Sequence, residues 1–112
     1  MEDCIFCKIA KGEIPSNKVY EDDMMICFHD LNPQAPVHLL AIPKIHVAKL
    51  TDVDEVTAAH IGHVFSKIPE IAEKMNLGKG FRVIANCGEY AGQTVFHVHF
   101  HILGGKPFSP SF

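Results

Sequence analysis

Three histidines alternate with apolar residues near the end of the chain, in the order His97-Val98-His99-Phe100-His101. In a β-strand successive side chains point to opposite faces, so the three imidazoles would share one face and the apolar residues the other. Alternate residues lie about 6.6 Å apart, which is close enough for one phosphate to touch two imidazoles. Imidazole titrates near neutral pH, so a neutral ring can attack as a nucleophile while a neighbour stabilises phosphoryl charge. The spacing predicts phosphoryl chemistry on one face of this strand.

Two other interpretations of the histidines remain open from the residues alone. A metal-binding histidine tract and a solvated strand face rich in histidine would both show the same alternation. The aromatic and β-branched residues between the histidines, and Gly92-Gln93-Thr94 just before them, favour an active site.

These residues resemble the signature of the histidine triad family, His-φ-His-φ-His-φ-φ, where φ is apolar. The similarity extends along nearly the whole chain, through Ile5-Phe6, Gly12-Glu13-Ile14-Pro15, Phe28-His29-Asp30, Gln34-Ala35-Pro36, His38, Ile42-Pro43-Lys44, Asn86 and Gly92-Gln93-Thr94-Val95-Phe96. The ending Leu103-Gly104-Gly105 is similar to the Hint branch, whereas the dinucleoside polyphosphate branch commonly has Pro-Arg there. The resemblance implies a phosphoramidase or hydrolase acting on purine nucleoside 5′-monophosphate derivatives, of the adenosine 5′-phosphoramidate type.

The resemblance also implies a role for each histidine. His99 would attack the α-phosphorus and form a transient nucleotidyl-histidine that water then hydrolyses. His97 and His101 would orient that ring and contact the phosphate, and His38 would join them from an earlier strand. Taken alone, His38 could equally be a half-exposed strand residue.

A nucleotide pocket is implied by the same resemblance. Asp30 would accept hydrogen bonds from the ribose hydroxyls, since a carboxylate can accept from both. The residues expected at the phosphate are Asn86, Gly92, Gln93 and Thr94, and those expected at the base are Phe6, Ile9, Phe28 and Leu31. Loop polarity and core packing are the alternative explanations for these two groups.

The pair Cys4-x-x-Cys7 has a spacing typical of a metal or redox site in a reducing compartment. A tetrahedral zinc site needs two further ligands. Some bacterial triad proteins supply them from a Pro-Lys-x-His element and from the first triad histidine, which implies His46 and His97 here. Such a zinc would be structural, because four protein ligands leave no open position. Two reduced cysteines, or a redox pair, are the alternatives.

The elements that must position these residues follow from periodicity and turn chemistry. We expect a short helix at 6–11, strands at 19–20, 24–29, 38–42, 81–87 and 95–103, and one long amphipathic helix at 52–76. Asp52 and Glu55 resemble a capping box, Gly78 is placed as the C′ residue, and Pro69 should bend or split the long helix. The fold class is α+β, a five-stranded antiparallel meander sheet with one long and one short N-terminal helix.

Length and charge limit the partners. We expect a single domain over residues 1–112, with no nucleic-acid partner, because the net charge is −3 and no basic run is present. No apolar stretch reaches the roughly 18 residues of a membrane helix, and the first residues are acidic, which predicts a cytoplasmic protein without a membrane partner.

A chain this short leaves much apolar surface exposed, which predicts a homodimer. The family resemblance implies that the long helix and strand 81–87 meet their copies, joining two sheets into one of ten strands, with the tail at 106–112 near the partner's site. That tail contains no tryptophan, unlike the best-known Hint proteins. The rival functions are a dinucleoside polyphosphate hydrolase, a non-catalytic nucleotide-binding protein and a zinc-dependent interaction module.

Overall fold

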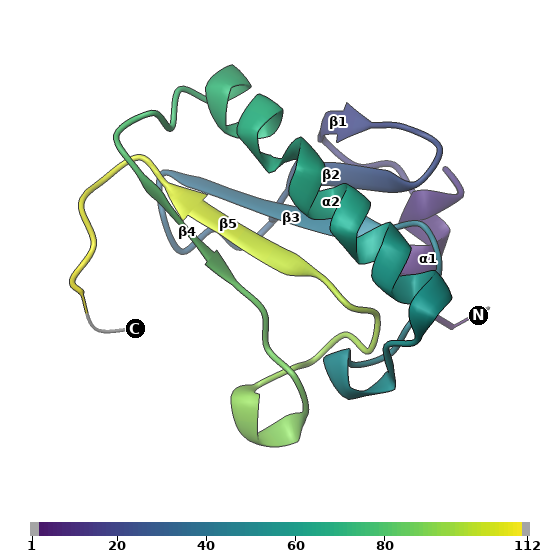
Figure 1. Cartoon of the computed structure of the whole chain (residues 1–112). Coiled ribbons are helices and arrows are strands. Elements are labelled where there is room, and N and C mark those ends of the chain that lie inside the picture. Colours follow the sequence, from purple (N-terminus) through teal and green to yellow (C-terminus); the bar gives the residue numbers. More distant parts are fainter. Residues whose placement is uncertain (1–2, 111–112) are drawn as a thin grey trace.

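Five antiparallel strands form one sheet in the computed structural model, which describes residues 3–110 (Figure 1). Their spatial order is β1-β2-β3-β5-β4. The strands are β1 Lys18–Glu21, β2 Met25–His29, β3 Val37–Pro43, β4 Phe81–Ile84 and β5 Phe100–Gly104. The helices are α1 Ile5–Ala10 and α2 Glu55–Lys74, with 3-10 turns η1 Leu50–Asp52 and η2 Glu89–Ala91. The expected α+β class with five antiparallel strands, one long helix and one short helix is confirmed.

The last two strands depart from a simple meander. The chain leaves β3, crosses the sheet through α2 and returns as β4 at the outer edge, then turns back as β5 between β3 and β4. A helical crossover allows this, because it carries the chain past a vacant strand position. The consequence is that β5, which holds His101, is paired on both sides.

The sheet separates two apolar clusters, and strand alternation decides which residue joins which. Met25, Leu39 and Phe100 pack on the α2 side, together with Val64, Ile68 and Ile71 of the helix. Ile26, Phe28, Leu40 and Ile42 pack on the other side against Phe6, Ile9 and Ala10 of α1. Because β2 and β3 are apolar on both faces, their side chains are buried almost throughout.

The ends of α2 differ from the expectation. The capping box is formed by Asp54 and Thr57, not by Asp52 and Glu55: Thr57 N–H donates to Asp54 Oδ1 at 2.9 Å, and Asp54 N–H donates to Thr57 Oγ1 at 2.9 Å. Asp52 belongs to η1. A threonine hydroxyl can accept the N-cap N–H in place of the glutamate that usually does so. The sequence prediction relied on an acidic residue at this position and therefore missed Thr57.

The C-terminal end of α2 is closed by Asn76 and not by Gly78. Asn76 has φ of 59°, a left-handed conformation that asparagine tolerates well. Pro69 was expected to bend or split α2, and it does not split it, since α2 is one helix from Glu55 to Lys74.

The ladder between β4 and β5 is shorter than expected. β4 ends at Ile84 and β5 begins at Phe100, so His97 and His99 precede the strand. Val98 N–H donates to Val47 O at 2.7 Å, which draws this segment toward the loop after β3 and away from β4. The alternation nevertheless persists: Val98, Phe100 and Ile102 pack with the α2 cluster, while Phe6 of α1 contacts the rings of His97 and His99.

Within the described part of the chain, neither α1 nor α2 combines the length and the apolar character that crossing a membrane requires.

Candidate active site

A cavity of about 490 Å³ opens on the α1 side of the sheet. Its wall combines apolar side chains with Asp30, Thr94 and four imidazoles, those of His29, His38, His99 and His101. The expected residues that line it are Phe6, Ile9, Phe28, Asp30, Leu31, His38, Thr94, His99 and His101. The volume falls within the range of small-molecule sites, in which an apolar wall is combined with a few polar groups.

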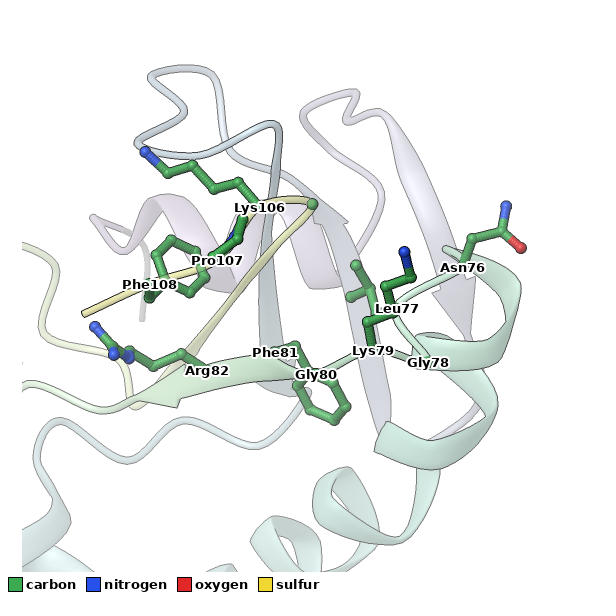
Figure 2. A pocket seen from close by; sticks show the side chains of 11 residues that line it. Asn76, Leu77, Gly78, Lys79, Gly80, Phe81, Arg82, Lys106, Pro107 and Phe108 are labelled. Carbon is green, nitrogen blue, oxygen red and sulfur yellow. The ribbon is translucent and has the colours of Figure 1, made fainter. Parts of the chain in front are cut away.

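A larger hollow of about 890 Å³ lies between the α2–β4 turn and the tail (Figure 2). Its lining residues are 76–82 and 105–108, and they include no histidine, cysteine or carboxylate. Arg82 there stacks under the Phe108 ring at 5.0 Å and donates to Ser109 O. The groups needed for nucleophilic or acid–base chemistry are therefore in the smaller cavity.

His99 is buried, and one of its nitrogens is fixed. Nδ1 lies 2.7 Å from the carbonyl oxygen of His97, which can only accept, so Nδ1 carries the proton. Nε2 of the neutral ring therefore has the lone pair. The edge-to-face contact with Phe6, at 5.1 Å between centroids and 84°, holds the ring plane. This is the protonation pattern that an imidazole nucleophile needs.

His38 and His101 form a hydrogen-bonded chain whose direction is set by the backbone. The N–H of Gln34 donates to His38 Nδ1 at 2.9 Å, so the neutral His38 ring carries its proton on Nε2. That nitrogen lies 2.9 Å from His101 Nδ1 and 3.3 Å from Asp30 Oδ2. His101 Nδ1 consequently accepts, and its Nε2 carries the proton. Burial, with smaller contributions from His99 and His38, lowers the pKa of His101, which keeps this ring neutral.

His97 is wholly buried and faces two cysteines. Its Nε2 donates to Pro43 O at 2.8 Å, which leaves the lone pair on Nδ1, 3.4 Å from Cys4 Sγ and 3.5 Å from Cys7 Sγ. Burial lowers the pKa of His97 to about 4, although the bond to Pro43 opposes that change. A ring that stays neutral with its lone pair toward two sulfurs suits a metal ligand better than an acid or base.

Cys4, Cys7, His46 and His97, here called the Cys2His2 centre, bring four ligand atoms within 4.8 Å of one another. Cys7 Sγ lies 3.2 Å from His46 Nδ1. A tetrahedral zinc ion with bonds of about 2.0–2.3 Å separates its ligand atoms by about 3.3–3.8 Å. The sulfur–nitrogen distances of 3.2, 3.4 and 3.5 Å in the centre are close to this range. Burial and the neighbouring Cys4 raise the pKa of the Cys7 thiol, and a divalent cation would offset this effect.

Asp30, His38 and His101 also bring potential ligand atoms within 4.8 Å. Their hydrogen bonds argue against a metal there. Because His38 Nδ1 accepts from a backbone N–H, the neutral ring carries its proton on Nε2. Nε2 could bind a metal only if the ring lost that proton and became an anion. This cluster is suited to orienting hydrogen bonds.

The comparison with family models decides the family. The HIT domain model matches residues 11–108, which is most of the chain. The chain belongs to the histidine triad (HIT) family. It is 41% identical over 110 residues to the purine nucleoside phosphoramidase of Escherichia coli strain K12, covering 97% of this chain and 92% of that relative.

Solved HIT structures share the fold. A histidine triad protein from Clostridium difficile is 49% identical with a TM-score of 0.95, covering 100% of this chain and 98% of the other. A HIT family hydrolase from Legionella pneumophila is 39% identical with a TM-score of 0.92, covering 97% and 98%. The fold inferred from the triad resemblance is therefore confirmed.

Three of the expected phosphate-binding residues, Asn86, Gly92 and Gln93, are not in the cavity wall. The amide of Gln93 is buried and engaged elsewhere: Oε1 accepts from Gly88 N–H at 2.8 Å, and Nε2 donates to Ala48 O at 2.8 Å and Val95 O at 3.1 Å. The bonds with Gly88 and Val95 shape the loop that carries Thr94, and the bond to Ala48 O holds this loop against the loop after β3. Gln93 therefore positions the loop.

Several wall residues were not assigned to the site from the sequence. They include Ile14, Pro15, Ser16, Asn17, His29, Asn32, Leu40 and Val95. Leu40 shares a strand face with His38, so alternation along β3 could have found it. The Gln34 N–H could not have been found, because every residue other than proline has that group.

Proposed function

We propose that this HIT protein hydrolyses nucleoside 5′-monophosphate derivatives of the phosphoramidate type through a nucleotidyl-His99 intermediate. The observation that carries the proposal is the fixed tautomer of His99, whose Nδ1 is tied to the His97 carbonyl at 2.7 Å while the ring borders the cavity. The purine nucleoside phosphoramidase of E. coli, at 41% identity, supports this substrate class.

In the first step His99 Nε2 attacks the α-phosphorus. A P–N bond to His99 forms as the P–N bond to the leaving amine breaks, and the amine takes up one proton from water. The positive charge on the His99 ring is stabilised by the His97 carbonyl, which accepts from Nδ1–H. In the second step water attacks phosphorus and the bond to His99 breaks. The proton that this water gives up neutralises the hydroxide formed in the first step, and the nucleoside monophosphate leaves.

His101 and His38 donate hydrogen bonds in this mechanism, and they do not donate protons. In the chain from Gln34 through His38 to His101 each Nδ1 accepts a hydrogen bond, so loss of the His101 Nε2 proton would leave an anionic ring. His101 Nε2–H is the group that would bind a phosphoryl oxygen as charge accumulates there. Thr94 on the opposite loop would add a hydroxyl.

The nucleoside would lie along the apolar part of the wall, with its ribose at Asp30. One carboxylate oxygen of Asp30 accepts from Asn32 N–H at 2.8 Å, and the other faces His38 at 3.3 Å. Each oxygen retains a lone pair, so the pre-oriented carboxylate could still accept from ribose hydroxyls. The apolar residues expected at the base are Phe6, Ile9, Phe28 and Leu31, all of which line the cavity.

Turnover of adenosine 5′-phosphoramidate by His99→Ala and His99→Asn tests the proposal. We expect no turnover in either variant and AMP binding that persists in both. Wild-type rates in either would exclude His99 as the nucleophile. Diadenosine polyphosphate, assayed in parallel with the wild-type protein, distinguishes the phosphoramidase from the dinucleoside polyphosphate hydrolase.

We propose further that the Cys2His2 centre holds a structural zinc ion. The donor set is two thiols and two imidazoles, with sulfur–nitrogen distances of 3.2, 3.4 and 3.5 Å. Zinc held by these four residues has no open position, so it would contribute stability and leave the chemistry to the imidazoles.

We also propose a homodimer that joins two sheets at β4. Within the described residues β4 is an edge strand, and apolar side chains are exposed on it and on α2: Phe81 at 37%, Phe65 at 44% and Val56 at 60%. A second copy could pair the edge and cover these side chains together.

A further inference from the structure

We propose that metal binding at the Cys2His2 centre and nucleotide binding in the neighbouring cavity strengthen one another, because both sites are built on α1. The inference rests on the proposed function, since it concerns the same cavity. It concerns α1 and His97, the two parts of the chain that belong to both sites.

The first shared part is α1 itself. This helix has six residues, which is too short to be stable without tertiary contacts. Cys4 is its N-cap, with Sγ accepting the Cys7 N–H at 3.4 Å, and Cys7 lies in its first turn. Both thiols belong to the centre, so a bound metal would fix the helix at its first turn.

The same helix supplies the apolar wall of the cavity. Ile5, Phe6 and Ile9 line it, and Phe6 lies between the two cysteines in sequence. The Phe6 ring packs against Phe28 at 5.8 Å and against His99 at 5.1 Å between centroids. Displacement of α1 would therefore change the base-binding wall and release the His99 ring at once.

The second shared part is His97. Its ring nitrogen Nδ1 faces the two sulfurs, and its carbonyl oxygen accepts the proton that fixes His99. Its ring also packs at 5.1 Å from that of His46, the remaining ligand. Metal binding at the Cys2His2 centre would therefore affect the orientation of His99 through a single residue, His97.

These contacts predict a positive coupling. A metal that orders α1 removes part of the entropy cost that a nucleotide would otherwise bear, and a nucleotide does the same for the metal. Coupling of this kind typically changes affinity by about 5- to 150-fold, and it must be equal in both directions.

Calorimetric titration of AMP into the zinc-loaded and the chelator-treated full-length protein tests the inference. We expect the Kd for AMP to rise at least about fivefold when zinc is removed. The reciprocal titration, zinc against a competing chelator, should show the same factor when AMP is saturating. Hydrogen exchange at residues 4–11 should slow with either ligand.

Two variants sharpen the test. His46→Gln removes a ligand that neither lines the cavity nor belongs to α1, and we expect it to weaken AMP binding as chelation does. Cys87→Ser changes a thiol outside the centre and should leave the coupling intact. If His46→Gln does not fold, the chelation experiment still decides the matter.

The outcomes separate the two proposals. Equal AMP affinity with and without zinc, or no zinc binding at all, would overturn the coupling and leave the proposed hydrolase untouched. Absence of AMP binding in every form would overturn both.

Discussion

The backbone N–H of Gln34 donates to Nδ1 of His38 across 2.9 Å, and this one bond sets the protonation of two imidazoles. Gln34→Pro removes the N–H, whereas Gln34→Ala keeps it. We expect Gln34→Pro to lower kcat for adenosine 5′-phosphoramidate about tenfold, since the loss of one oriented hydrogen bond costs about 1–2 kcal/mol. Gln34→Ala should retain the wild-type kcat.

Melting curves of both Gln34 variants serve as the folding control. Equal kcat values for folded Gln34→Pro and Gln34→Ala would show that the bond to His38 does not direct the site.

Asp30 offers a test of the ribose position. Asp30→Ala should weaken AMP binding by about 1–3 kcal/mol, the scale of lost hydrogen bonds to a charged acceptor. Asp30→Asn keeps an oxygen for Asn32 N–H and so separates turn geometry from charge. Calorimetry measures both, with the exposed Asp23→Ala as the control. An AMP affinity unchanged in Asp30→Ala would place the ribose elsewhere.

Features that follow from side-chain alternation were predicted correctly from the sequence. Features that depend on hydrogen bonds between segments far apart in the chain were missed. Alternation assigned Val98 and Phe100 to one face and the triad to the other, because the pleat alone decides this. The end of the β4–β5 ladder was predicted wrongly, since the bond from Val98 N–H to Val47 O joins segments 51 residues apart. The family resemblance named ligand types for the metal, but only the folded chain brings Cys7 within 3.2 Å of His46.

Gln93 illustrates the same difficulty and leads to a stability prediction. A polar residue beside Thr94 was expected at the phosphate, yet its amide makes three bonds, two within its own loop and one to Ala48 O in the loop after β3. Gln93→Ala should lower the free energy of unfolding by about 1–3 kcal/mol, because buried backbone groups lose their partners. Gln93→Glu keeps Oε1 but loses both donors, so chemical denaturation should rank it below wild type. An unfolding energy unchanged in Gln93→Ala would contradict the role of the amide.

Asp22 links α2 to the β1–β2 turn and should make stability depend on pH. Burial would raise the pKa of Asp22, but hydrogen bonds from His63, Met24 N–H, Tyr20 and Met25 N–H hold it well below its usual range. A carboxyl whose folded pKa is depressed stabilises the protein above its unfolded pKa, about 3.9, and this contribution is lost as the pH falls below that value.

Asp22→Asn should therefore lower Tm at pH 7 by several degrees, equivalent to about 1 kcal/mol for a domain of this size. Near pH 3 the difference from wild type should narrow. Melting curves over this pH range check the expectation, and a difference in Tm that stays constant from pH 7 to pH 3 would show that the Asp22 charge contributes nothing.

β4 is an edge strand that a second copy of the chain could pair with, and the C-terminal tail lies beside it. Light scattering at micromolar concentration should find twice the 12.4 kDa of one chain, because a second copy can pair β4 and cover the exposed side chains near it. The tail lies beside β4, where Phe108 stacks on Arg82 at 5.0 Å, while Ser111 and Phe112 lie outside the described residues. Deleting residues 108–112 removes that stack. Because the family resemblance implies that the tail lies near the partner's site, we expect the truncated protein to change its preference among phosphoramidate leaving groups and to keep the dimer mass. A wild-type particle of 12.4 kDa that is fully active would exclude the dimer, and a truncated dimer with unchanged preference would exclude a role for the tail.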